Sequence, residues 1–317
     1  MTVAVVLLAY AGCFGILGAR VLGRARWTAR APLLGILTYL AAGWSVVAAV
    51  GLAGLTLAVH ATALGGGLSY LLGACVRRLR DLYATPGGAT VAELGLVLAG
   101  AVVARTALAA TGQLRAAGRQ ALRHAQGARL TGRHEPTLGA VVLEHAQPAA
   151  YCVAGRCPTV IVTTGAMAAL NSGQLNAVLA HERAHLAGRH HALKATARIG
   201  RQVLPFLPLL RAAEAHVARL AELHADDAAI RAADPRALAT ALVVLATPAQ
   251  ATPAPALAAA ATDVVQRIHR VLAPAEPLGR LRRHLLRATA TALALVPVLV
   301  ALTPAVVALA LGRVPAA

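Results

Sequence analysis

Four long apolar stretches with few or no charged side chains divide the chain. Residues 2–19, 33–60 and 288–311 contain no Asp, Glu, Lys or Arg, and a further stretch lies between residues 85 and 112, most apolar over 94–104. A helix of about 20 predominantly apolar residues is long enough to cross a bilayer. The pattern therefore predicts about four transmembrane helices. Pro297 and Pro304 in the last stretch do not exclude this, because membrane helices tolerate proline.

Three features of these stretches leave alternatives open. Residues 2–19 could form a signal peptide, but no basic segment precedes the apolar run, which favours a membrane span. Residues 61–76 are apolar and contain three consecutive glycines, so they either extend a hairpin or dip into the membrane interface. Glu93 and Arg105 flank the third stretch. One of them must lie near the membrane, either in a polar contact inside the bundle or, as we expect, snorkelling at the end of the span.

A polar region, residues 113–286, separates the last two apolar stretches and holds 20 of the 30 basic and 10 of the 12 acidic side chains. Its first residues, to about 127, predict an Arg-rich helix next to the membrane. β-Branched residues at 140–143 and 159–163 predict short strands. Asn171, followed three residues later by Gln174, predicts the capped start of a helix.

Two further segments of the polar region are expected to be connections. Residues 203–210 contain two prolines and are too few to cross a bilayer, so they are expected to form a turn or to contact the membrane surface. Residues 251–261 are almost entirely Ala and Pro, and are expected to be a poorly ordered connector.

The composition argues against a simple soluble protein. Apolar residues make up 58% of the chain and charged residues 13%, with a mean hydropathy of +0.66, against about 45–50% and about 25% in ordinary soluble domains. The net charge is +18, but the basic residues flank apolar segments and only 3% of residues are aromatic. A base-stacking nucleic-acid surface is therefore not expected. The cysteines lack zinc-ribbon spacing and are expected to be free thiols; they are Cys13, Cys75, Cys152 and Cys157.

Arginines set the expected orientation in the membrane. Arg20, Arg24, Arg26 and Arg30 follow the first apolar stretch at once. Because short basic loops remain on the cytosolic side, we expect the N-terminus outside and residues 113–286 in the cytosol. The expected organisation is a membrane region over 1–112 with about three spans, a cytosolic domain over 113–286, and a transmembrane helix with a short tail over 287–317.

The sharpest chemical signal is the sequence His181-Glu182-Arg183-Ala184-His185, a His-Glu-x-x-His motif on a predicted helix. Residues i and i+4 share one helix face, so the two imidazoles can occupy adjacent corners of a zinc tetrahedron. Glu182, next to the first ligand, is placed to act as a general base on a water molecule at the metal.

Two residues are candidates for the third zinc ligand. Residues 181–191 fit a longer pattern with His191 as ligand, but that pattern requires a downstream methionine, and both Met1 and Met167 precede the motif. His190 and His191 are therefore expected to be polar residues at a helix end. Glu222 is the favoured ligand, and Asp226, one helical turn later, is expected to accept the outer N–H of a ligating histidine.

Residues 150–152, 160–165, 175–186 and 222–228 together resemble the BlaR/MecR-type membrane zinc metallopeptidases. They are also similar to the HtpX and CAAX-protease group, which shares the Glu-x-x-x-Asp element. The resemblance is close over residues 139–240. It implies a gluzincin peptidase with His181, His185 and Glu222 as ligands, Glu182 as base, and a catalytic domain facing the cytosol. BlaR-type receptors carry a sensor after their last span, and because this chain ends at Ala317, we expect no such sensor.

Together these observations predict a mainly α integral membrane protein, with about four transmembrane helices and an α+β zincin-like (gluzincin) metallopeptidase domain between the third and fourth. The expected function is that of a multi-pass cell-membrane zinc metalloendopeptidase with one Zn²⁺ per chain. It would cleave a protein substrate such as a transcriptional repressor, with membrane lipid as a partner and no direct contact with nucleic acid.

Two other functions stay open: an HtpX-like quality-control protease, and a non-catalytic zinc-bound scaffold. The intact Glu182 weighs against the scaffold. An extended substrate could pair with residues 159–164 as an added strand, although these residues are equally compatible with an internal strand.

Overall fold

The computed structural model describes the chain except for residues 59–87, 156–157, 247–253, 274–275 and 311–317. Among the described residues, four helices are long and apolar enough to cross a membrane. They are α1 (Thr2–Gly23), α3 (Pro32–Ala58), α5 (Gly88–Thr131) and α12 (Arg280–Ala310). A short helix, α2 (Trp27–Arg30), joins α1 to α3. The residues 61–76, whose membrane location was left open, lie outside the described residues.

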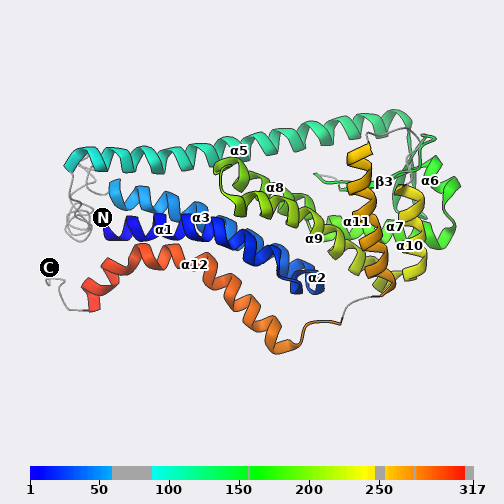
Figure 1. Cartoon of the computed structure of the whole chain (residues 1–317). Coiled ribbons are helices and arrows are strands. Elements are labelled where there is room, and N and C mark those ends of the chain that lie inside the picture. Colours follow the sequence, from blue (N-terminus) through cyan, green and yellow to red (C-terminus); the bar gives the residue numbers. More distant parts are fainter. Residues whose placement is uncertain (59–87, 156–157, 247–253, 274–275, 311–317) are drawn as a thin grey trace.

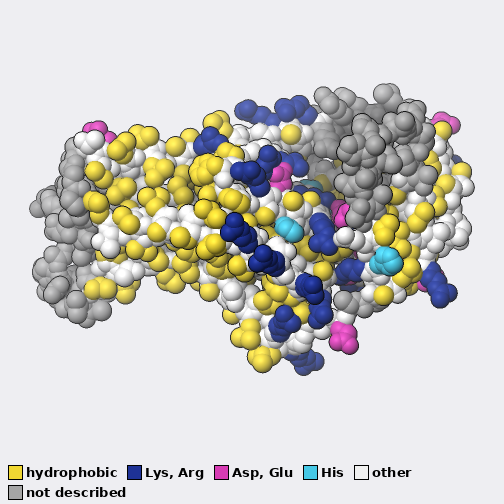
Figure 2. Space-filling model, in the orientation of Figure 1, with side chains coloured by type: hydrophobic (Ala, Val, Ile, Leu, Met, Phe, Trp, Pro, Cys, Tyr) yellow, Lys and Arg dark blue, Asp and Glu magenta, His cyan; other side chains and the backbone are white. Residues whose placement is uncertain are grey.

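The four apolar helices lie side by side at one end of the molecule (Figure 1). The start of α1 and the ends of α3 and α12 point away from the polar region, and α5 begins at that same end (Figure 1). Apolar side chains cover most of this half of the surface, and basic side chains gather where it meets the polar half (Figure 2). This arrangement fits a membrane protein with the polar region on one side of the bilayer.

Glycines set the contact between α3 and α5. A Cβ atom at Gly54 would lie 2.7 Å from the backbone nitrogen of Ala99 and 2.7 Å from the carbonyl oxygen of Gly95. A Cβ at Gly95 would likewise lie 2.6 Å from the carbonyl oxygen of Gly54. The two backbones are therefore in direct contact, as is usual for close helix pairs in membranes.

The helix α5 continues without interruption past residue 112 into the polar region, where it leads to the sheet. The strands are β1 (Gly132–Glu135), β2 (Ala140–Leu143), β3 (Ala150–Val153) and β4 (Thr159–Thr163). They are ordered β1-β2-β4-β3, with β2 parallel to β4 and the other pairs antiparallel. Both strands predicted from the sequence are therefore present.

Of the two alternatives left open for residues 159–164, the structure supports the internal strand and not pairing with a substrate. β4 is bonded to β2 on one side and to β3 on the other, so neither of its edges can accept another strand. In the described sheet the edge strands are β1 and β3.

Six further helices complete the polar region: α6 (Thr164–Ala169), α7 (Ser172–Ala187), α8 (His190–Val203), α9 (Pro208–Ala232), α10 (Pro235–Ala246) and α11 (Ala254–Leu272). The expected connector at residues 251–261 is wrong from Ala254 onward, because α11 begins there. Alanine is the best helix former, and Pro255 lies in the first turn, where its missing N–H removes no intrahelical bond.

The helices α8 and α9 form a hairpin between the sheet region and the apolar bundle (Figure 1). Near its turn the hairpin packs on α1 and α3, and α8 also packs on α5. Arg105 of α5 donates to the carbonyl oxygens of Val203 at 3.0 Å and Gln202 at 2.6 Å. Arg105 therefore makes a polar contact with the end of α8, in place of the snorkelling that was expected.

Candidate metal centre

The helix α7 begins with the predicted capping box. The backbone N–H of Gln174 donates to Asn171 Oδ1, and the backbone N–H of Asn171 donates to Gln174 Oε1, both at 2.9 Å. Two backbone donors that the helix itself leaves unpaired are thereby satisfied. The helix continues through the His-Glu-x-x-His motif and ends at Ala187, so His181, Glu182 and His185 lie on one rigid element.

The structure brings the three predicted ligands together. His181 Nε2 and His185 Nε2 are 3.1 Å apart, and Glu222 Oε2 of α9 lies 3.6 Å and 3.5 Å from them. A four-coordinate zinc ion with bonds of about 2.0–2.2 Å requires ligand atoms roughly 3.3–3.6 Å apart. The donor set of two imidazoles and one carboxylate also suits zinc. The two distances to Glu222 lie in this range and the distance between the imidazoles is slightly shorter, so these residues could hold a zinc ion.

The outer nitrogen of His181 faces Asp226, as the sequence predicted. His181 Nδ1 lies 3.0 Å from Asp226 Oδ1, and Asp226 is 0% exposed. The guanidinium of Arg267, on α11, donates to both carboxylate oxygens of Asp226, at 2.8 Å and 2.7 Å. Burial alone would raise the pKa of Asp226, but the bonds from Arg267 and His181 outweigh it and lower that pKa. Asp226 is thus ionised, with an oxygen placed where it could accept the outer N–H of His181.

The charges around His181 and Glu222 favour the binding of a cation. Burial alone would lower the pKa of His181, but the hydrogen bonds with Asp226 and Glu222 outweigh it and raise the pKa to about 9. Burial would raise the pKa of Glu222, but the bonds from His181 and His185 and the charge of Lys194 hold it well below its usual range. Two ionised carboxylates therefore surround the histidine nitrogens, which suits a divalent metal.

His185 is oriented by other histidines. His185 Nδ1 lies 2.7 Å from His190 Nδ1, and His190 Nε2 lies 2.8 Å from His224 Nδ1. His190 lies at a helix end, as expected, because it is the first residue of α8, but it is buried (1% exposed) and bonded to two histidines, which the sequence did not predict. Burial and the neighbouring His185 and His224 lower the pKa of His190 to about 3, so it is neutral at neutral pH. A neutral ring can accept the Nδ1–H of His185, which leaves Nε2 of His185 for a metal.

The turn between α7 and α8 explains why His190 is buried. Arg189 adopts a left-handed conformation, with a φ of 48°, which reverses the chain and directs His190 back toward His185. Gly188 precedes it, and a Cβ atom there would collide with the ring of His190. This position thus requires glycine because of the close approach of the ring, and not because of its own backbone conformation.

Glu222 is held by the chain's only lysine. Lys194 Nζ of α8 donates to Glu222 Oε1 at 2.9 Å, which leaves Oε2 facing the two histidines. Arg267 Nη1 lies 3.6 Å from the same Oε2. Side chains from α7, α8, α9 and α11 thus converge on one buried network.

The predicted base, Glu182, faces the sheet. The thiol of Cys152, on the edge strand β3, lies near its carboxylate and lowers its pKa. Burial raises the pKa of Glu182, although the nearby His181 and His185 oppose the shift. Burial and the charge of Glu182 raise the pKa of Cys152 to about 12, so the thiol stays protonated and remains a donor. A carboxylate with a raised pKa is better matched to proton transfer near neutral pH.

The other candidates from the sequence lie outside the cluster of donors. His191 is exposed and is not one of the three grouped side chains, which disfavours the longer histidine pattern. His224 contacts His190 and does not face the ligands. Arg183, inside the motif, donates to the carbonyl oxygen of Leu138 in the β1–β2 connection.

Sequence reasoning missed four side chains of the network: His190, Lys194, Arg267 and Arg270. Arg267 and Arg270 are three residues apart on α11, and Arg270 donates to Asp227 at 2.9 Å and to the carbonyl oxygen of Ala29 at 2.9 Å. Their spacing on one helix face, opposite the scarce acids at 226 and 227, was an available signal. Lys194 was available too, as the single exception to an all-arginine chain.

A comparison with protein families gives one match: the model described as Peptidase family M48 matches residues 111–216. The matched range contains His181, Glu182 and His185, and ends before Glu222. No curated protein and no solved structure matches this chain. The match supports a peptidase of a metallopeptidase family that is typically membrane-bound and zinc-dependent, as the sequence predicted, without singling out the BlaR/MecR type.

Proposed function

We propose that this protein is a membrane zinc metalloendopeptidase with one zinc ion per chain, held by His181, His185 and Glu222. The observation that carries the proposal is the convergence of three donor atoms, 3.1–3.6 Å apart, which is close to the spacing in a tetrahedral zinc site, with Glu182 beside them on α7. The match to a peptidase family over the same helix supports it.

The chain's own groups have defined roles in this reaction. A zinc ion at this position would acidify a water molecule and polarise the carbonyl of the scissile bond. Glu182 takes the proton of the attacking water and passes it to the leaving amine. Asp226 and His190 keep the two imidazoles oriented with Nε2 inward. Lys194 holds Glu222 so that a single carboxylate oxygen faces the metal position.

We assign substrate pairing to the edge strand β3. β3 lies against α7, and Cys152 in its centre contacts the predicted base. An extended peptide added along β3 would therefore run past Glu182 and the zinc ligands. This assignment replaces the pairing with residues 159–164, which β2 and β3 exclude.

The preferred biological role is regulatory cleavage of a protein such as a transcriptional repressor, by a catalytic domain over 113–286 that faces the cytosol. The arginines at 20, 24, 26 and 30 are all exposed at the end of α1 and in the α1–α3 connection, which supports this orientation in the cell membrane.

A second candidate function is cleavage of membrane proteins. The α8–α9 hairpin favours it, since α9 packs on α3 up to Leu220, two residues before Glu222, which lies about 21 Å along α9 from the turn at Pro208.

The experiment compares Glu182→Gln with Glu222→Gln in the full-length protein. Glu182→Gln is nearly isosteric and should keep zinc while lowering peptide hydrolysis by roughly 10²–10⁴-fold, the usual contribution of a general base. Glu222→Gln should lose zinc as well as activity, because a neutral amide is a weaker ligand. Zinc content and turnover are measured side by side, and Glu182→Gln also serves to trap substrates for mass spectrometry.

Two outcomes would overturn the proposal. Near-normal turnover of Glu182→Gln would exclude it as the base. Full zinc retention in Glu222→Gln, with loss of zinc in His191→Ala, would show that the third ligand is His191.

A further inference from the structure

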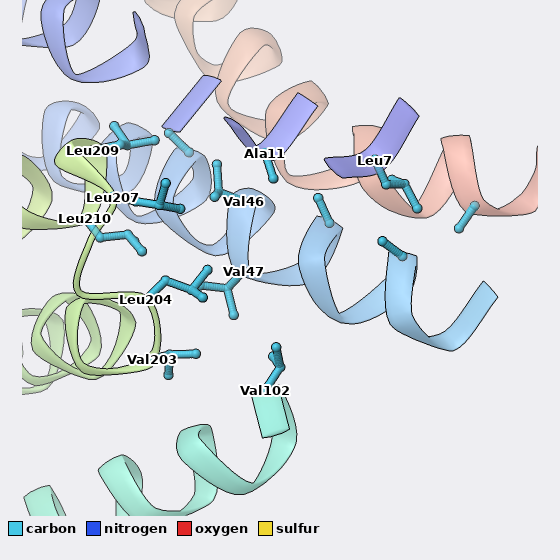
Figure 3. Packing of buried hydrophobic residues seen from close by; sticks show 14 of the residues in the cluster. Leu7, Ala11, Val46, Val47, Val102, Val203, Leu204, Leu207, Leu209 and Leu210 are labelled. Carbon is cyan, nitrogen blue, oxygen red and sulfur yellow. The ribbon is translucent and has the colours of Figure 1, made fainter. Parts of the chain in front are cut away.

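The turn of the α8–α9 hairpin is buried in the apolar bundle and not against the polar domain. We define the hairpin tip as residues 203–210. Its apolar side chains form one cluster with residues of α1, α3 and α5, among them Leu7, Ala11, Val46, Val47 and Val102 (Figure 3). The contacts are close at small residues: a Cβ atom at Gly15 would lie 3.1 Å from Leu207 Cδ2, and one at Gly43 would lie 2.9 Å from Leu210 Cδ2.

These contacts give the depth of the tip. Gly15 lies five residues before Arg20 on α1, which corresponds to about 8 Å along a helix. Val102 lies three residues before Arg105 on α5, which corresponds to about 4.5 Å. Arg105 flanks the most apolar part of α5 and marks its edge; farther along α5, Gln113 accepts a hydrogen bond from Arg198, which is paired with Glu214. The tip therefore packs against the apolar parts of α1 and α5 near the ends that face the polar domain.

Several polar backbone groups of the tip have partners inside the protein. Irregular backbone is tolerated at membrane depth only where its polar groups find partners. Arg105 binds the carbonyl oxygens of Gln202 and Val203, and Arg211 donates to that of Phe206 at 3.3 Å. The carbonyl oxygens of Leu204 and Leu207 accept backbone N–H groups within the turn. Pro205 and Pro208 have no N–H to satisfy.

One large apolar side chain of the tip points outward. Phe206 is 66% exposed, while Leu204 and Leu207 on either side of Pro205 and Phe206 are buried. On α5, Leu108 lies one turn after Arg105, which binds the start of the tip, and is also exposed. An exposed phenylalanine on a tip that packs against the apolar spans extends the apolar surface that those spans present to lipid.

We propose that the hairpin tip is a re-entrant membrane element, and that Phe206 contacts the acyl chains of the leaflet on the side of the polar domain. The partner is therefore phospholipid hydrocarbon. The inference does not depend on the proposed peptidase activity, since it rests on packing, depth and backbone partners alone. It also means that α8 and α9, which carry Lys194 and Glu222, are anchored directly in the bilayer.

The test places a photo-reactive residue at the tip of the full-length protein in phosphatidylcholine–phosphatidylglycerol nanodiscs. Phe206 is replaced by p-benzoyl-phenylalanine, which keeps its aromatic ring. Val97 of α5, 67% exposed on a predicted span, is the lipid-facing control. Val243 of α10, 51% exposed in the polar domain, is the control away from the bundle. After illumination, phospholipid adducts are measured by intact-protein mass spectrometry.

The expected result is a phospholipid adduct at position 206 with a yield comparable to that at 97, and none at 243. Absence of a phospholipid adduct at position 206 would overturn the proposal, as would cross-linking of position 206 to a second copy of the chain. A second measurement compares Phe206→Asp with Val243→Asp in the same nanodiscs. Only Phe206→Asp should lower the melting temperature, because a carboxylate is poorly tolerated in hydrocarbon; equal melting temperatures would contradict the insertion.

Discussion

The metal centre and the α3–α5 contact hold helices together by opposite means. At the metal centre, buried polar side chains connect α7, α8, α9 and α11, with Asp226 paired to Arg267 and His190 bonded to two other histidines. At the α3–α5 contact, Gly54 and Gly95 let the two backbones touch. The first arrangement fixes the direction of particular atoms, whereas the second fixes only the distance between two helices.

This difference determines how each region fails. Removing one partner of a buried charged pair leaves the other charge uncompensated and is strongly destabilising. Adding atoms to a tight contact forces the helices apart and typically costs about 1–3 kcal/mol. Substitutions at the metal centre should therefore change metal affinity and stability together, whereas substitutions at the helix contact should change stability alone.

The largest effect in this comparison is expected for Asp226→Asn. The amide keeps the shape but loses the charge that orients His181 and pairs with Arg267, so zinc affinity should fall by about 100-fold, the upper end for partners of metal ligands. Asp227→Asn is the matched control, since Asp227 pairs with Arg270 and touches no ligand. Zinc affinity is measured by chelator competition. Equal affinities in the two variants would show that Asp226 does not position His181.

A smaller effect is expected for His190→Ala. Loss of the neutral ring frees His185 Nδ1 and leaves a cavity, and zinc affinity should fall by about tenfold, the lower end for such partners. His191→Ala, the adjacent and exposed histidine, should bind zinc as the unmodified protein does. His190→Asn, whose side-chain oxygen can still accept the Nδ1–H, should recover part of the loss. A Co²⁺-substituted protein adds a spectroscopic readout of ligand geometry, and unchanged spectra in His190→Ala would contradict the role.

The sequence predicted those parts of the metal centre that depend on spacing along a single helix. The spacing of His181 and His185 follows from helical periodicity, and the Asn171–Gln174 cap is a local pattern that the structure confirms. The four apolar helices were predicted for the same reason, because hydrophobicity over about 20 residues needs no knowledge of neighbours.

The remaining parts depend on contacts between segments that are far apart in the chain. His190 was missed because its burial depends on the left-handed Arg189 and on α9, which supplies His224. β4 lies inside the sheet because β2 and β3 pair with its two edges, and the residues of β4 alone do not show that they do so. The depth of the hairpin tip was missed for a similar reason: Gly15 and Gly43 have no periodic signature, and only the folded bundle shows what packs against them.

The smallest effect is expected for Gly54→Ala at the α3–α5 contact. There the direction of the change in stability is more informative than its size. A methyl group at Gly54 would meet the backbone of α5 at 2.7 Å, so the helices must separate. Alanine also favours a helix over glycine by about 1 kcal/mol, which offsets part of that strain. The net loss should be about 1 kcal/mol, at the low end of the range for overpacked sites. Gly100→Ala is the control on the same helix pair, because nothing lies within 4 Å of its added methyl.

Gly100→Ala should therefore show the helix preference alone and raise the melting temperature slightly, while Gly54→Ala lowers it. Both are measured by thermal unfolding in the same detergent, with zinc affinity as a second readout that neither variant should change. If the two substitutions moved the melting temperature in the same direction, backbone contact at Gly54 could not be what holds α3 to α5. If Gly54→Ala also weakened zinc binding, the helix contact and the metal centre would have to be coupled, and the α8–α9 hairpin, which packs on α3 and carries Lys194 and Glu222, would be the element that connects them.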